Sequence, residues 1–186
     1  MSGLQIWLHG KLASATAVAE FMRSAWAWPA VESIHFIGLT LLFGTIAVWD
    51  LRLLGLLPRV SIADLHRFVP FAVLGFAINA ASGSLFLMTE PDQYVYNPAF
   101  QFKLLLLAIA GLNVVVFYAT IFRRLRVLPP GGDAPRVARL FGATSLICWI
   151  GVIVCGRLIT FYRPGLCRSG EPLAFIVECI PQLAGR

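Results

Sequence analysis

The sequence predicts an all-α membrane protein: a four-helix bundle with an N-terminal amphipathic surface helix and a short periplasmic C-terminal tail. Three observations support this fold class. Of the 186 residues, 59% are hydrophobic and 13% are charged, against about 45–50% and about 25% in soluble domains. Four apolar segments each approach the roughly 20 residues that a bilayer requires. The loops between them alternate between arginine-rich and acidic, which is typical of a chain that crosses a membrane repeatedly.

Residues 1–30 are expected to form an amphipathic helix and a linker. Hydrophobic side chains recur at helical spacing within residues 4–27, with Glu20 and Arg23 between them; they are Val18, Phe21, Met22, Ala25 and Trp26. Such a helix lies flat on a membrane surface. Its charges and its many Ala and Ser residues make a fifth span the weaker alternative. Pro29 is expected to break the chain before the first span.

The bundle is predicted to occupy residues 31–162, with the spans at about 32–56, 65–89, 99–122 and 138–160. The first loop holds Ser61 and Asp64 at the spacing of a helix-capping box. Arginines fill the first and third loops and are absent from the second. The positive-inside rule therefore predicts that the first and third loops are cytoplasmic and that both termini lie on the outer side, which is the periplasm in a bacterial inner membrane.

The periplasmic tail, residues 163–186, contains Cys167 and Cys179. In an oxidising compartment, two such cysteines are expected to form a disulfide, and a metal pair is the less favoured alternative. Cys148 and Cys155 in the fourth span are expected to act as small hydrophobic residues. The net charge of +6 is explained by topology, so the expected partner is the lipid bilayer and no nucleic acid.

Ionisable side chains inside the spans are the candidate functional residues, because a bilayer makes them costly. His35 lies about one turn inside the first span, and Lys103 about one turn inside the third. The two are therefore expected at the same depth, near the outer surface. Arg157, at the outer end of the fourth span, joins this layer. Glu32 lies one turn from His35 on the same face, where it is placed to orient the imidazole.

This constellation is suited to one b-type haem. His35 would bind the iron, Lys103 would be a second ligand or a propionate partner, and Arg157 a propionate partner. His66 begins the second span at the opposite surface, about 30 Å away at 1.5 Å per residue, so it cannot bind the same iron. His9 is an alternative second ligand.

Simpler interpretations of these residues stay open. His35 is alternatively an interfacial histidine bonded to Glu32 or a carbonyl, and Lys103 alternatively extends to the interface. The mid-span Asn79 and Asn113 are expected to form interhelical hydrogen bonds. Further expectations are an Asp50–Arg52 pair at the inner end of the first span, and an approach of the flat haem ring at Gly38 and Gly83.

The stretches "WAWPAVESIHFIGLTLLFGTIAVWDLRLLG", "FAINAASGSLF" and "NPAFQFKLLLLAIAGLNVVVF" resemble an uncharacterised family of small four-span bacterial inner-membrane proteins. A His early in the first span and F-x-x-K at the third are more distantly similar to membrane protoporphyrinogen oxidase and the copper-resistance D-type permeases. In the oxidase family a His and a Lys at these places are associated with haem b, which implies those roles for His35 and Lys103. The family's W-L-H-x-K is FQFK here.

The expected function is electron transfer between the quinone pool and a periplasmic or membrane redox partner, carried out by an integral inner-membrane protein with haem b. One alternative is a cofactor-free accessory or scaffold subunit of a larger membrane complex. The other, implied by the resemblance, is a porphyrin-oxidising membrane enzyme. The sequence leaves open whether the protein is an enzyme.

Overall fold

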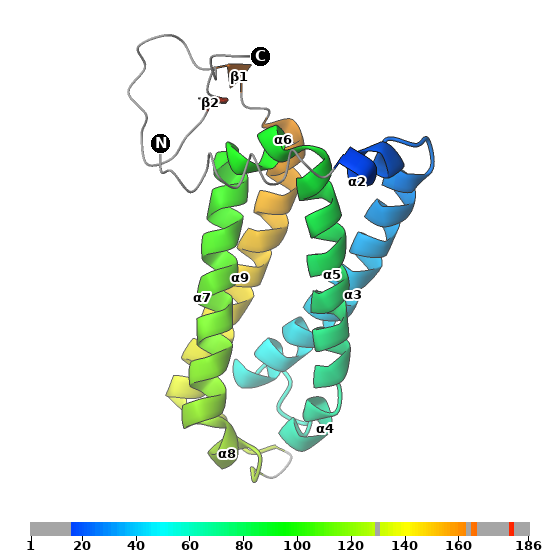
Figure 1. Cartoon of the computed structure of the whole chain (residues 1–186). Helices are drawn as coiled ribbons and strands as arrows, with labels where there is room; N and C mark the ends of the chain where they lie inside the picture. Colours follow the sequence, from blue (N-terminus) through cyan, green and yellow to red (C-terminus); the bar gives the residue numbers. More distant parts are fainter. Residues whose placement is uncertain (1–15, 129–130, 163–164, 167–178, 181–186) are drawn as a thin grey trace.

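The computed structural model describes residues 16–128, 131–162, 165–166 and 179–180. Four long helices run side by side: α3 (Ala27–Leu53), α5 (Val69–Thr89), α7 (Pro98–Thr120) and α9 (Arg136–Phe161) (Figure 1). Within the described residues, four short helices lie at the ends of the bundle: α2 (Thr16–Met22), α4 (Ile62–His66), α6 (Pro91–Val95) and α8 (Phe122–Leu125). The predicted all-α bundle of four long helices is confirmed. We call its two ends the α6 end and the α4 end.

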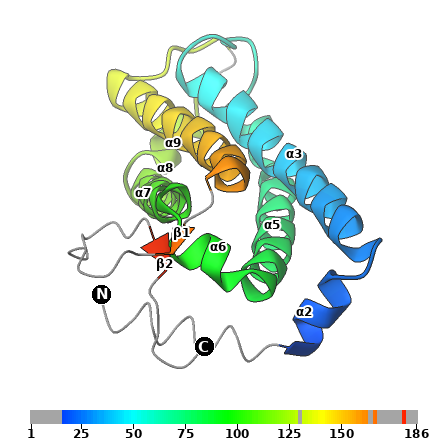
Figure 2. The ribbon, with the colours of Figure 1, turned by 90° about the horizontal axis from the view of Figure 1, so that it is seen from above.

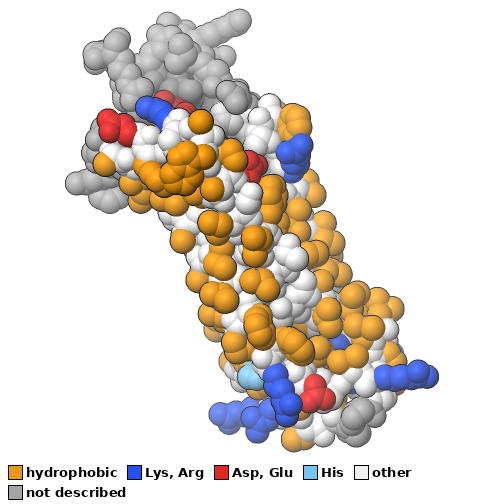
Figure 3. Space-filling view, turned by 90° about the vertical axis from the view of Figure 1, so that its right-hand side faces the viewer, with side chains coloured by type: hydrophobic (Ala, Val, Ile, Leu, Met, Phe, Trp, Pro, Cys, Tyr) orange, Lys and Arg blue, Asp and Glu red, His pale blue; other side chains and the backbone are white. Residues whose placement is uncertain are grey.

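The four long segments are long and apolar enough to cross a bilayer: Ala27–Leu53, Ile62–Thr89, Pro98–Thr120 and Arg136–Phe161. Figure 3 shows hydrophobic side chains along the length of one face of the bundle and several Lys and Arg side chains at its lower end. A surface of this kind fits a lipid bilayer. The chain is therefore a multi-pass membrane protein, with four candidate spans within its described residues.

The long helices form two close pairs. Helix α3 packs on α5 and α7 packs on α9, and contact between α3 and α9 joins the pairs (Figure 2). A Cβ atom added to Gly75 would lie 2.6 Å from the Gly38 carbonyl oxygen and 2.6 Å from the Leu42 nitrogen. The α3 and α5 backbones therefore touch at this crossing, as small residues allow in membranes. The crossing fixes which residues of α3 and α5 meet.

Local chemistry sets the ends of α3. The helix begins at Ala27, so the expected break at Pro29 is wrong: a proline in the first turn loses no intrahelical hydrogen bond. The helix ends at Leu53, earlier than the predicted residue 56. Gly55 follows with φ +87°, a left-handed conformation that commonly ends helices and that glycine adopts without strain.

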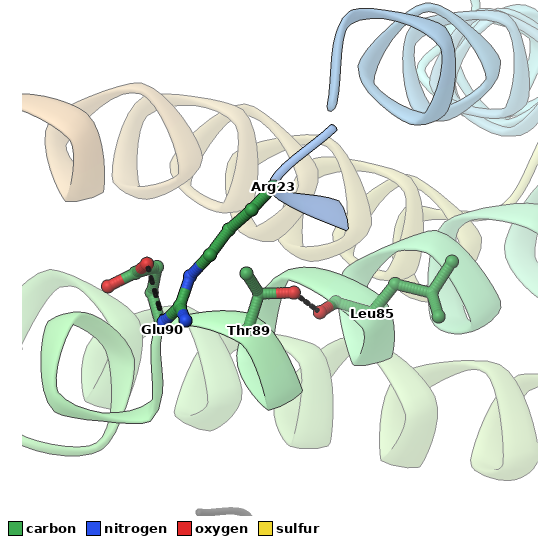
Figure 4. Close-up of polar contacts among 4 residues, drawn as sticks. All are labelled: Arg23, Leu85, Thr89 and Glu90. Carbon is green, nitrogen blue, oxygen red and sulfur yellow. Dashed lines mark hydrogen bonds and ion pairs between the residues drawn. The ribbon is translucent and has the colours of Figure 1, made fainter. Parts of the chain in front are cut away.

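The N-terminal segment is described from residue 16. Of residues 4–27, which were predicted to form an amphipathic surface helix, Thr16–Met22 form the short helix α2, and a turn follows. Residues 1–15 lie outside the described part, so the amphipathic surface helix stays a prediction. Met22 is buried. Just past α2, Arg23 reaches Glu90, which follows α5, with 3.9 Å between nitrogen and oxygen (Figure 4). Both side chains are largely exposed, so this ion pair stabilises the contact only slightly.

The C-terminal tail is described only at two short strands. Strand β1 (Gly165–Leu166) pairs in parallel with β2 (Cys179–Ile180). Cys167 lies outside the described residues, so the disulfide with Cys179 stays a prediction.

Arg52 ties together the loops at the α4 end. It is 1% exposed. Its Nε donates to the Val60 carbonyl at 2.6 Å, and its Nη2 donates to the Gly132 carbonyl at 3.1 Å. The expected Asp50–Arg52 pair is therefore wrong, because side chains two positions apart on a helix do not face each other. The predicted cap is confirmed: Ser61 Oγ accepts from the Asp64 N–H at 3.4 Å.

Candidate functional site

His35 lies on α3 against Ser82 of α5, with 2.7 Å between Nδ1 and the serine Oγ. The Ser82 hydroxyl donates to the Ile78 carbonyl at 2.6 Å. A hydroxyl has a single hydrogen, so Ser82 must accept from Nδ1–H of His35. The neutral imidazole then carries its lone pair on Nε2. One interhelical hydrogen bond thus sets the tautomer of this histidine.

Aromatic rings and a glycine surround the imidazole. The His35 ring meets Phe86 edge-on, with 5.8 Å between centroids, and Trp28 lies 4.9 Å from Phe86. A Cβ atom added to Gly83 would lie 3.9 Å from His35 Cε1. Gly38 was predicted to let a flat ring approach, but α5 occupies the space beside it: a Cβ atom added to Gly38 would lie 2.6 Å from Asn79 Nδ2. The absence of a side chain at Gly38 therefore lets α5 pack closely on α3.

Lys103 on α7 shares the layer of His35, as predicted from its distance to the end of its span. It lies close enough to the imidazole to interact with it electrostatically, and it also interacts with Cys155 of α9. Its Nζ is 3.5 Å from the position of a Cβ on Gly156, so this glycine leaves room for the amine. The bundle therefore places His35 and Lys103, which come from its two helix pairs, within electrostatic range of each other.

Arg157 stacks on an aromatic ring of its own helix. Its side chain is exposed, and its guanidinium carbon lies 4.9 Å from the ring centroid of Phe161, which is 70% exposed. Such stacking is favourable for arginine at an interface. The structure therefore does not bring Arg157 beside His35, and its role as a propionate partner stays a prediction.

Glu32 is exposed, and the hydrogen-bond partner that the structure gives to His35 Nδ1 is Ser82. The charge of Glu32 acts instead on Tyr94 of α6. Burial, with the nearby carboxylates of Glu32 and Glu90, raises the pKa of Tyr94 to about 12. A part for Glu32 in binding a cofactor stays a prediction.

Asn97 holds the ends of α7 and α9 together above Lys103. It is fully buried, its Nδ2 donates to the Tyr162 carbonyl at 2.6 Å, and its Oδ1 caps α7 by accepting from the Ala99 N–H at 2.9 Å. This contact keeps the part of α9 that contains Gly156 beside α7.

His66 belongs to the opposite end of the bundle. It lies in α4, in an aromatic cluster with Phe122 at 4.8 Å and with Tyr118 at 6.1 Å between ring centroids. The structure therefore keeps it apart from His35, as the span lengths predicted. His9 lies outside the described residues.

The two mid-span asparagines form different kinds of hydrogen bond, one between helices and one within a helix. Asn113 of α7 donates to the Phe141 carbonyl of α9 at 3.2 Å, so the predicted interhelical bond is confirmed. Asn79 donates to the Gly75 carbonyl of its own helix at 3.0 Å, so the prediction for it is wrong. An amide at this position reaches the carbonyl one turn back, and that bond satisfies it locally.

Ser82 is the site residue that sequence reasoning missed. A signal was present: Gly75, Asn79 and Ser82 recur at i, i+4 and i+7, which places a glycine and two polar residues on one face of a membrane helix.

No family model, curated protein or solved structure matches the chain. Fold and site together define a four-span membrane protein with a half-buried imidazole held between two helices. Its function has to be argued from that geometry.

Proposed function

We propose that the protein is an integral inner-membrane b-type haem protein that transfers electrons between the quinone pool and a redox partner on the periplasmic side. The observation that carries the proposal is the His35–Ser82 hydrogen bond. Ligating histidines almost always donate their other ring N–H to an oxygen, which fixes the tautomer and raises the basicity of the ligating nitrogen. Ser82 supplies that oxygen here.

The residues around His35 include groups that can ligate a haem iron and a cation that can pair with a haem propionate. His35 offers Nε2 as an axial ligand, and Lys103 offers an amine for the second position or a cation for a propionate. Phe86 and Trp28 provide an apolar wall. A bound haem would supply one-electron redox chemistry.

The side chains of this chain perform the remaining tasks. Ser82 orients the imidazole. Gly83 and Gly156 keep the space beside His35 and Lys103 free of side chains. The arginines of the loops at the α4 end favour placing that end in the cytoplasm, and His35 then lies near the periplasmic surface.

The test is the absorption spectrum of the detergent-purified protein, oxidised and dithionite-reduced. We expect a Soret band and an α-band in the wild type. His35→Ala should lose both bands, whereas His66→Ala, which removes a similar half-buried imidazole from the opposite end, should keep them.

Two results would contradict the proposal. One is a colourless wild type from cells well supplied with haem, which would favour the cofactor-free accessory subunit. The other is a spectrum that His35→Ala leaves unchanged.

A further inference from the structure

A cavity of about 360 Å³ lies in the half of the bundle toward α4. Its lining comes from all four long helices and includes neither His35 nor Lys103. Val73 and Phe76 of α5 and Val114 of α7 line it and are 62%, 50% and 43% exposed. The cavity therefore opens between α5 and α7, toward the bilayer.

The cavity is mainly apolar, and Asp50 and Trp149 are among the buried side chains with polar atoms in its lining. Asp50 is 3% exposed and Trp149 is 6% exposed. Within the part of the chain that the structure describes, neither Asp50 Oδ2 nor Trp149 Nε1 has a hydrogen-bond partner. Buried polar atoms are almost always satisfied by protein, water or a ligand. These two atoms therefore offer an occupant of the cavity one hydrogen-bond acceptor and one donor.

The two atoms belong to one polar strip. Asp50 of α3 lies beside the Ser145 hydroxyl of α9. Trp149 follows Ser145 by one turn on the same face of α9. The acceptor and the donor therefore stand on the floor of the cavity, opposite its opening between α5 and α7.

We propose that the cavity binds a lipid-soluble quinol, or its quinone when the Asp50 carboxyl carries the proton, with the ring head group at Asp50 and Trp149 and the tail leaving between α5 and α7. A hydroxyl is the group that can both donate to a carboxylate and accept from an indole N–H. The cavity's size falls within the about 300–1,000 Å³ of small-molecule sites. Its wall offers flat partners for a ring: Trp49, Phe117, Tyr118 and Phe141.

Other amphiphiles match the two groups less well. A phosphate or a fatty-acid carboxylate would bring a negative charge into a mainly apolar cavity whose lining residues include no Lys or Arg to pair with it. A lipophilic ammonium has donors only and would leave the Trp149 N–H unsatisfied. The physiological meaning of this site, as the quinone contact of an electron-transfer protein, rests on the proposed function, but the binding itself requires no haem.

Gly111 of α7 gives a direct test. It lines the cavity, and a Cβ atom added there meets nothing within 4 Å. Gly111→Leu therefore places a side chain at the cavity without displacing a neighbour. Gly44→Leu is the matched control: Gly44 on α3 is also exposed, has equally open space at its Cβ, and is absent from the lining. Both variants keep the five tryptophans.

The measurement is equilibrium binding of decylubiquinone to the full chain in lipid nanodiscs, followed by quenching of tryptophan fluorescence. We expect saturable quenching in the wild type, an affinity at least tenfold weaker in Gly111→Leu, and a change below twofold in Gly44→Leu. Trp149→Phe should also bind more weakly, measured as a smaller rise in unfolding temperature on adding the quinone.

Three results would overturn the inference: no saturable binding in the wild type, unchanged affinity in Gly111→Leu, or tighter binding of tetraphenylphosphonium or oleate than of decylubiquinone at the same site. A colourless protein that binds the quinone would contradict the haem proposal alone. A haem-containing protein that fails to bind it would contradict the cavity inference alone.

Discussion

Removing the Ser82 hydroxyl should weaken the candidate site in two measurable ways. Ser82→Ala leaves the half-buried Nδ1–H of His35 without the acceptor that now lies at 2.7 Å. Interhelical hydrogen bonds in membranes contribute about 0.6 kcal/mol on average and up to about 1.7 kcal/mol. Because a donor is left unsatisfied, we expect a loss near the upper value. Haem affinity should fall by about 10–100-fold, as for other residues that orient ligating histidines.

Ser84 provides the matched control on the same helix. Its hydroxyl donates to the Ala80 carbonyl at 2.7 Å, just as that of Ser82 donates to Ile78 at 2.6 Å, but Ser84 is exposed. Ser84→Ala therefore removes the same backbone contact without touching His35. Ser82→Thr keeps the oxygen and should restore haem affinity.

The assays are reversible unfolding in mixed micelles, for the free energy, and haem titration of the apoprotein, for affinity. Equal effects of Ser82→Ala and Ser84→Ala in both assays would refute the reasoning.

Three further predictions concern the frame of the site. Gly75→Ala should destabilise the bundle by about 1–3 kcal/mol, because the added Cβ atom would lie 2.6 Å from backbone atoms of α3. The control Gly44→Ala should not destabilise it, because a Cβ atom there meets nothing within 4 Å. Equal thermal midpoints of the two variants would contradict this packing. Asn97→Ala should cost about 1–3 kcal/mol, because the Tyr162 carbonyl would keep only the longer bond from Gln93 Nε2 at 3.3 Å and the Ala99 N–H would lose its acceptor. An unchanged thermal midpoint would count against this contact. Folding raises the Tyr94 pKa from 10.0 to about 12, so the contribution of Tyr94 to stability is complete below pH 10 and is lost as the pH rises toward 12. Tyr94→Phe should therefore lose less stability than the wild type over this range. Parallel profiles of stability against pH for the two proteins would refute the shift.

The spans could be predicted from the sequence because bilayer thickness fixes their length and composition. Counting residues from the ends of the spans also predicts that His35 and Lys103 lie at the same depth in the membrane. The exact ends of α3 could not be found in this way, since Pro29 and Gly55 act through local backbone chemistry that hydropathy does not report.

The partner of His35 and the cavity depend on how the helices pair. Ser82 meets His35 because α3 crosses α5 at Gly38 and Gly75, and a hydropathy pattern does not specify a crossing point. The closeness of Asp50 and Arg52 in the sequence predicts an ion pair between them. The fold instead separates them, with Arg52 bonded to loop carbonyls and Asp50 facing the cavity.

The most direct test of the account is the reduced-minus-oxidised spectrum of His35→Gly before and after imidazole is added. If His35 Nε2 is an axial ligand, the variant should lack the haem bands and imidazole should restore them, while His66→Gly should resemble the wild type throughout. Haem bands of normal intensity in His35→Gly without imidazole would contradict the central claim, because the haem would then be held elsewhere.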